Sequence, residues 1–191
     1  MVSIIIPYVR WDGYERCLNA IFKNAGDVEF EVVSEEDVDR IGCPKMVNFL
    51  VRKSKYDLVC FMHDDSVPKP GFLEQALKVM QTFDRGWGCV GLNDKVYGPE
   101  GPCTHWLIHK KMLQYFPDGF ACEDYRHTRW DRELQDVCTK HGRYKWAEYA
   151  VVGHRNPYVC PGAHFDETFL YGYNADNLKH DAEVYEKRRG E

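Results

Sequence analysis

Short apolar runs alternate with amphipathic segments along the first part of this chain, and that alternation constrains its fold more than any other feature. The runs have the length and the β-branched or aromatic content of buried strands. They lie at residues 2–6, 30–33 and 58–62. Residues 12–22 and 45–53 carry apolar side chains at helical spacing, and Gly26 marks the exit of the first helix. The resulting β-α-β-α-β order favours a doubly wound α/β sheet.

This order predicts a single α/β domain, residues 1–191, with a mostly parallel central sheet flanked by helices. Parallel strands need right-handed crossovers, and ligands then gather beyond the carboxyl ends of the strands. A chain of 191 residues is long enough for one compact domain but too short for two ordinary ones. The later segments continue the pattern, with helical spacing at 70–80 and 131–140, strand-like runs at 89–92 and 146–152, and a charged helix from about Ala175.

Composition narrows the class of protein and of partner. The net charge of -5 and the pI near 5.9 argue against nucleic acid as a partner, because neutralising many phosphates needs a basic face. No apolar run approaches the roughly 20 residues that a membrane span requires, and no signal peptide precedes the first strand. The eight cysteines contain no C-x-x-C pair, which favours buried thiols over structural zinc. We therefore expect a soluble, cytoplasmic protein.

Two adjacent carboxylates, Asp64 and Asp65, follow the third apolar run. Because parallel strands present ligands at their carboxyl ends, this pair lies where a metal and a diphosphate would bind. Carboxylate oxygens are hard ligands that suit Mg²⁺ or Mn²⁺. The pair also fits a helix N-cap beside a solvated acid, and the residues alone leave both interpretations open. If the strand continued through the pair, His63 and Asp65 would point to the same face.

Several motifs, taken in order, resemble the family 2 glycosyltransferases, which have a GT-A fold. That family begins with a strand of the form V-S-I-I-I-P, places acidic residues after its second strand, carries an asparagine on the next helix and ends an apolar strand in its metal motif. The matching segments are Val2 to Pro7, Ser34-Glu35-Glu36-Asp37, Asn48 and Phe61-Met62-His63-Asp64-Asp65. The His-Asp-Asp variant resembles one found among rhamnosyltransferase-like members. The resemblance covers roughly residues 1–155.

The resemblance implies where a metal ion and a sugar donor bind. It assigns Mn²⁺ or Mg²⁺ to Asp65 with His63 and His154, the last because Val151-Val152-Gly153-His154 resembles the family's histidine-bearing strand. Either histidine also fits a structural role in the core. The implied donor contacts are Pro7, Arg10, Glu35, Glu36, Asn48 and Asp64. The chain departs from the family where Val9 and Arg10 replace the usual tyrosine and asparagine, and where the acidic segment lacks glycine.

The resemblance also implies a catalytic base. A family helix that starts with an acid and ends in glycine is matched by Trp130-Asp131-Arg132-Glu133-Leu134 through Gly142, so Asp131 is the first candidate. A charge at a helix N-terminus is the alternative interpretation of this residue. Glu123 and Asp124 form an acidic pair in the preceding segment and are the alternative bases.

Together these features imply a metal-dependent, inverting, hexosyltransferase-like enzyme that moves a sugar from a nucleotide diphosphate sugar to a hydroxyl of a glycan or another acceptor. Residues 1–95 would bind the nucleotide sugar, residues 96–155 would form the acceptor and catalytic half, and residues 156–191 a C-terminal tail. An inactive sugar- or nucleotide-binding module is the first alternative. A nucleotidyltransferase is the second, although Pro7 to Gly13 lacks a glycine-rich phosphate loop. The motifs leave the sugar, the nucleotide, the acceptor and the oligomeric state open.

Overall fold

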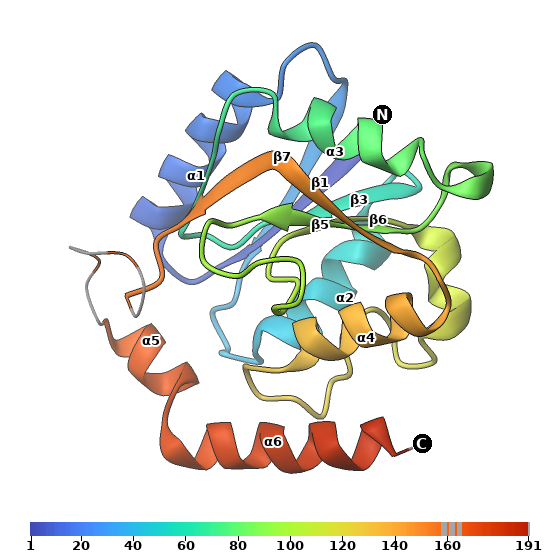
Figure 1. The fold of residues 1–191 in the computed structure, drawn as a ribbon. Helices are drawn as coiled ribbons and strands as arrows, with labels where there is room; N and C mark the ends of the chain where they lie inside the picture. The colour runs from blue at the N-terminus through green and yellow to red at the C-terminus, as the bar shows by residue number, and fades with distance from the viewer. Residues whose placement is uncertain (158–159, 161–162, 164–165, 191) are drawn as a thin grey trace.

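A seven-stranded sheet runs through the centre of the computed structural model, which describes residues 1–157, 160, 163 and 166–190 (Figure 1). The strands lie side by side in the order β2-β1-β3-β6-β5-β7-β4. Their bounds are β1 Val2–Tyr8, β2 Phe30–Glu36, β3 Leu58–Phe61, β4 Ser66–Pro68, β5 Cys89–Asn93, β6 Trp106–His109 and β7 Tyr144–His154.

Helices cover both faces of this sheet, with α1 and α3 on one side and α2 and α4 on the other (Figure 1). The bounds of the α-helices are α1 Trp11–Asn24, α2 Cys43–Lys53, α3 Phe72–Met80, α4 Trp130–Lys140, α5 Glu167–Gly172 and α6 Ala175–Arg189, and the short 3-10 helices are η1 Asp84–Gly86 and η2 Lys110–Tyr115. No helix in the described part of the chain has the length and apolar character needed to cross a membrane.

The apolar runs form the core, as the sequence pattern predicts. In β1, Ile4, Ile5 and Ile6 are each 0% exposed, because the strand is central and helices cover both of its faces. Cysteines inside such runs, among them Cys60 and Cys89, are buried free thiols that pack as small apolar side chains. The predicted α/β class with one domain is therefore confirmed.

The sheet is more mixed than the simple alternation predicts. Strand β1 pairs in parallel with β2 and β3, and β5 pairs in parallel with β7. Strand β6 lies between β3 and β5 and is antiparallel to both, while β4 is antiparallel to β7. The sequence pattern missed β6 and β4, because each is too short to show a period.

The C-terminal helix α6 runs along the outside of the molecule beside α4 (Figure 1). A buried carboxylate, Asp181, fixes its position. It accepts hydrogen bonds from the backbone N–H groups of Arg126, His127 and Thr128 at 2.8, 2.9 and 2.6 Å. Because these three residues precede α4, α6 holds the segment that leads into the predicted catalytic helix.

The turn after β3 differs from the expected continuation of that strand. Strand β3 ends at Phe61, and the backbone N–H of Ser66 donates to the carbonyl oxygen of His63 at 3.2 Å, which closes a turn around Asp64 and Asp65. Strand β4 then begins at once and pairs with the end of β7, with Ser66 opposite His154. The adjacent carboxylates therefore lie on a tight turn rather than on alternating faces of a strand.

Candidate active site

A cavity of about 580 Å³ opens beyond the carboxyl ends of the central strands. That volume falls within the roughly 300–1,000 Å³ that small-molecule sites occupy. Its inner wall includes His63, Asp65 and His154, and Asp131 and Arg129, from the start of α4, also line it. A smaller cavity of about 110 Å³ adjoins it at the end of β1. The site therefore lies where the α/β order predicts that ligands bind.

Arg10 holds Asp64 against the end of β1. One carboxylate oxygen of Asp64 accepts hydrogen bonds from the backbone N–H groups of Val9 and Arg10 and from Nε of Arg10, each at 3.2 Å, and the other oxygen pairs with the guanidinium. Burial alone would lower the pKa of Arg10, but Asp64, Asp65 and Asp166 raise it above its usual range. Asp64 thus joins β1 to the turn after β3, and its oxygens are already occupied.

Asp65 is in the opposite situation, because its Oδ1 is buried and has no hydrogen-bond partner among the described residues. Its nearest charged neighbours are Nε2 of His154 at 3.4 Å and the guanidinium of Arg10 at 3.7 Å. Burial alone would raise the pKa of Asp65, but His154, His63 and Arg10 outweigh it and hold this pKa well below its usual range. The carboxylate is therefore ionised and turned into the cavity.

His154 lies between two carboxylates. Its Nε2 faces Asp65, and its Nδ1 lies 3.8 Å from Oδ2 of Asp94. Burial lowers the pKa of His154, but the two carboxylates together raise it to about 9, so a cation that binds Nε2 would displace the proton there. A register shift in the ladder between β5 and β7 aligns Asn93 with Val151, and so brings the end of β7 close to Asp94. The position of His154 is therefore set by strand pairing on both sides.

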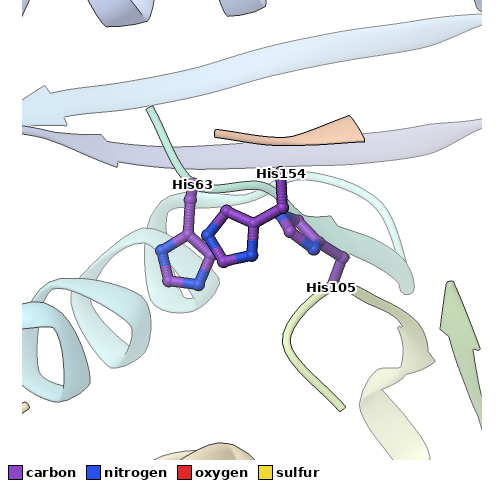
Figure 2. A group of neighbouring side chains, drawn as sticks. All are labelled: His63, His105 and His154. Carbon is purple, nitrogen blue, oxygen red and sulfur yellow. The ribbon is translucent and has the colours of Figure 1, made fainter. Parts of the chain in front are cut away.

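Three histidines converge at this inner end of the cavity (Figure 2). The rings of His63 and His154 are stacked with centroids 5.3 Å apart, and the ring of His105 stands edge-on to both. Burial, followed by the neighbouring His154, lowers the pKa of His63 to about 3, so its imidazole is neutral. Candidate ligand atoms of the three rings lie within 4.8 Å of one another.

The hydroxyl groups around His105 make it the poorest metal ligand of the three. Thr104 donates its hydroxyl hydrogen to Asp94 at 2.7 Å, so towards Nδ1 of His105, 3.1 Å away, it can only accept. Nδ1 of His105 therefore carries the hydrogen, and Nε2 accepts from the hydroxyl of Ser66 at 2.6 Å. Both nitrogens of His105 are engaged, which leaves Asp65, His154 and His63 as the groups that fit a divalent cation.

A cation is consistent with the chemistry of these three side chains. A buried carboxylate oxygen that no protein group satisfies is a common mark of an ion or water site. Carboxylate and imidazole together suit Mn²⁺ and related divalent ions, whereas Mg²⁺ prefers oxygen ligands. The predicted ligands Asp65, His63 and His154 are thus brought together by the fold, although they come from two separate elements.

Asp131 lies across the cavity from this corner, in the first turn of α4. Its Oδ1 accepts a hydrogen bond from the backbone N–H of Arg132 at 2.9 Å. Burial raises the pKa of Asp131 to about 6, against the opposing effect of the backbone N–H groups around it. A carboxylate with a pKa near neutrality that faces a cavity is chemically suited to accept a proton.

The other predicted site residues divide into those that line a cavity and those that do not. Pro7 and Arg10 line the smaller cavity, and Arg10 also lines the larger one. Glu35 pairs with Lys53 on the surface at 2.8 Å, and Glu36 is exposed beside it. The described residues that line these two cavities do not include Glu35 or Glu36. Asp37, the acidic residue that follows them, lines the smaller cavity.

Asn48, a predicted donor contact, and Glu123, an alternative base, are hydrogen-bonded to each other in the structure. The amide nitrogen of Asn48 donates to the carbonyl oxygens of Asp118 and Ala121 at 3.0 and 2.7 Å, and to Glu123 at 3.2 Å. These bonds hold the loop before α4. The described residues that line the two cavities do not include Asn48, Glu123 or Asp124. Among the predicted bases, proximity to the cavity therefore favours Asp131.

Sequence reasoning missed several residues of the site. Asp94, His105, Tyr97 and His127 all lie at or behind the cavity wall. One signal could have found Asp94, because it directly follows the apolar run at 89–92, as Asp64 and Asp65 follow an earlier run. No local pattern predicts His105 or His127. His105 directly precedes β6, which pairs with β3 and β5, and the backbone N–H of His127 is held by Asp181 of α6.

Comparison with known proteins bears on the fold. No protein-family model and no curated protein sequence matches this chain. Among solved structures, the mannosyltransferase PcManGT from Pyrobaculum calidifontis, in complex with GDP-Man and Mn²⁺, superposes with a TM-score of 0.64 at 15% identity, over 80% of this chain and 56% of its own. The S. aureus protein TarS 1-349, in complex with UDP, has a TM-score of 0.59 at 15% identity, over 76% of this chain and 57% of its own.

A third structural neighbour is glucosyl-3-phosphoglycerate synthase from Mycobacterium tuberculosis, in complex with Mn²⁺, UDP and glucosyl-3-phosphoglycerate. Its TM-score is 0.55 at 15% identity, over 82% of this chain and 72% of its own. The chain spans little more than half the length of the first two neighbours. At this identity the likeness concerns the fold alone, and the described residues form a single α/β domain with the fold of the GT-A glycosyltransferases.

Proposed function

We propose that this chain is a metal-dependent, inverting glycosyltransferase that moves a sugar from a nucleotide diphosphate sugar to an acceptor hydroxyl. One observation carries the proposal: Asp65, at the carboxyl end of β3, has a buried oxygen without a hydrogen-bond partner among the described residues, 3.4 Å from His154. The fold supports it, because neighbours with this fold were solved with UDP, GDP-Man and Mn²⁺.

Asp65 and His154, with His63 beside them, would hold the metal ion. A divalent ion at this corner would neutralise negative charge on the departing nucleoside diphosphate, which can contribute several kcal/mol in the transition state. Mn²⁺ suits the mixed carboxylate and imidazole ligands better than Mg²⁺ does. Arg10, which already contacts Asp64, Asp65 and Asp166, adds a fixed positive charge on the same side of the cavity.

The smaller cavity would take the nucleoside. Pro7 and Asp37 line it at the ends of the first two strands, and it meets the larger cavity at Arg10 and His63. This arrangement leads from a nucleoside pocket to the metal corner and on to Asp131. It supports a division in which residues 1–95 bind the donor, residues 96–155 face the acceptor, and residues 156–191 form a tail.

Asp131 would act as the general base. Its carboxylate would take the proton of the acceptor hydroxyl while that oxygen bonds to the anomeric carbon. The bond from that carbon to the diphosphate oxygen would break on the opposite face, so that the configuration inverts. A base with a pKa near 6 is ionised at neutral pH and still basic enough to accept the proton.

The test combines a screen with one substitution. Purified protein is screened for thermal stabilisation by a panel of nucleotide sugars, with and without Mn²⁺, because a ligand that binds the folded state raises the melting temperature. Calorimetry then compares UDP and Mn²⁺ binding by the natural protein and by Asp65→Ala. Asp27→Ala, which removes an exposed carboxylate that lines neither cavity, is the matched control.

We expect metal-dependent donor binding by the natural protein and by Asp27→Ala, and its loss in Asp65→Ala. Transfer is then measured as release of nucleoside diphosphate with candidate acceptors. Unchanged binding by Asp65→Ala would overturn the metal assignment. Tight donor binding with no transfer to any acceptor and no donor hydrolysis would favour the inactive binding module.

A further inference from the structure

Asp94 is a buried carboxylate whose position is fixed from three directions. It directly follows β5 and is 2% exposed. Its Oδ1 accepts hydrogen bonds from the backbone N–H groups of Val96 and Tyr97, both at 2.9 Å, and its Oδ2 accepts from the hydroxyl of Thr104 at 2.7 Å. The position of the carboxylate is therefore fixed.

Among the described residues, Oδ2 of Asp94 accepts a hydrogen bond from Thr104 alone. Thr104 supplies a single hydrogen to Oδ2, and His105 directs its own Nδ1 hydrogen to Thr104 rather than to Asp94. A carboxylate oxygen can accept two hydrogen bonds. The next polar atom beyond Oδ2 is Nδ1 of His154, at 3.8 Å.

Nδ1 of His154 is the matching donor. It is buried and has no hydrogen-bond partner among the described residues. A ring movement of about 1 Å would bring it within hydrogen-bond distance of Asp94. The opposite nitrogen, Nε2, faces Asp65 at 3.4 Å. One ring nitrogen therefore faces each carboxylate. Figure 2 shows this ring beside that of His63.

We propose that Asp94 is a positioning residue that accepts the Nδ1–H of His154 and so keeps the Nε2 lone pair directed at the metal corner. This inference rests on the proposed function, which gives His154 to the metal. A metal-bound histidine commonly donates its other ring N–H to a carboxylate or carbonyl, which fixes the ring orientation and raises its basicity. Asp94 would do this from behind the site without touching the metal or the donor.

Substitution of Asp94 by Asn replaces the acceptor Oδ2 with an amide NH₂, so the hydroxyl of Thr104 loses its acceptor there and must turn. Asn can keep Oδ1 as the acceptor for Val96 and Tyr97, so the loop retains its turn. Its amide NH₂ then stands where Oδ2 stood and donates to Nδ1 of His154. The ring hydrogen moves to Nε2, which can no longer ligate a cation. We expect Asp94→Asn to weaken Mn²⁺ binding by about tenfold to a hundredfold.

The experiment is a double-mutant cycle on metal affinity, which needs no turnover. Mn²⁺ binding in the presence of inorganic pyrophosphate is measured by electron paramagnetic resonance for the natural protein, Asp94→Asn, His154→Ala and the double variant. If Asp94 acts through His154, Asp94→Asn has no further effect once the imidazole is gone. A merely structural role would weaken binding by the same factor in both backgrounds.

A matched control separates positioning from general damage to the fold. Asp181→Asn also replaces a fully buried carboxylate that caps backbone N–H groups, but it lies between α6 and the segment before α4. We expect its Mn²⁺ affinity to equal that of the natural protein. Thermal unfolding of each variant confirms that it is folded at the temperature of measurement.

The outcomes distinguish this inference from the proposed function. If the natural protein binds no Mn²⁺ at this corner, the proposed function fails. If it binds Mn²⁺ but Asp94→Asn binds equally well, or loses the same factor with and without His154, the positioning role is overturned while the metal site stands. Loss of binding only where His154 is present supports the role.

Discussion

The two ends of the main cavity are built on different principles. At the inner end, the side chains of Asp65 and His154 are largely buried, and Asp94 behind them is buried and fixed by backbone N–H and hydroxyl groups. At the outer end, Arg129, which directly precedes α4, and Arg189 on α6 have exposed side chains. Arg129 has a left-handed backbone with φ of +68° and stacks over Tyr185 at 5.7 Å.

This contrast indicates different functions for the two ends of the cavity. Rigid buried groups shift one another's pKa values and can hold a metal, because water cannot screen them. Exposed groups on surface helices have weaker, more adaptable contacts and can vary without loss of the core. Asp131 lies between the two ends. We therefore expect chemistry to depend on the inner end and acceptor preference on the outer end.

The largest expected effect is at the boundary between the two ends. Asp131→Asn removes the candidate base with little change in shape, so transfer should fall by about 10²–10⁴-fold while donor affinity is unchanged. Steady-state release of nucleoside diphosphate gives the rate, and calorimetry gives the donor affinity. Full transfer by Asp131→Asn would return the role of base to Glu123 or Asp124. The candidate base would then no longer lie between the inner and outer ends of the cavity.

The pH dependence of transfer comes next. Because burial raises the pKa of Asp131 to about 6, its carboxylate must lose a proton before it can act, and activity should rise with pH up to that value. At saturating Mn²⁺, kcat/KM should fall about tenfold for each pH unit below about 6. A profile that stays flat to pH 5 would contradict the assignment. Donor binding measured at pH 5 controls for loss of the metal.

A smaller effect concerns stability, and it compares the ion pair of Asp64 with the exposed ion pair of Glu35. Asp64→Asn removes the partner of Arg10 and should lower the free energy of unfolding by about 2–3 kcal/mol, somewhat less than for a fully buried ion pair. Glu35→Gln breaks the exposed pair with Lys53 and should change it by less than about 1 kcal/mol. Urea unfolding measures both. Equal effects would mean that Asp64 does not fasten β1 to the turn after β3.

The smallest effect is expected at the outer end. Arg129→Gly relieves a left-handed backbone, as does Arg85→Gly at φ of +62°, so each should gain up to about 1 kcal/mol of stability. Only Arg129→Gly should raise the acceptor KM, by less than about tenfold, with kcat unchanged. A fall in kcat in Arg129→Gly would contradict the expectation that the outer end affects acceptor binding and not the chemical step.

Much of this architecture follows from patterns that the sequence carries locally. The buried runs at 2–6 and 58–62 predict β1 and β3, and strand ends predict where Asp64 and Asp65 lie. The difference between those two carboxylates does not follow from sequence, because it depends on Arg10 reaching back across the turn. Spacing alone therefore treats a structural carboxylate and a candidate ligand as equals.

The rest of the site depends on long-range pairing. His105 enters through β6, an antiparallel strand that no alternation predicts, and Asp94 meets His154 through a register shift between β5 and β7. Asn48 has a place in a family motif that predicts a donor contact, and in the structure its hydrogen bonds hold the loop before α4. Motif order thus located the cavity better than it located the hydrogen bonds around it.

The most direct test of the account is the position of the metal. Crystals of the natural protein are soaked with UDP and Mn²⁺, and anomalous scattering at the manganese edge locates the ion. We expect one Mn²⁺ within bonding distance of Asp65 and of Nε2 of His154, between these side chains and the diphosphate. Bound UDP with that corner empty, or with manganese held elsewhere on the chain, would contradict the central claim.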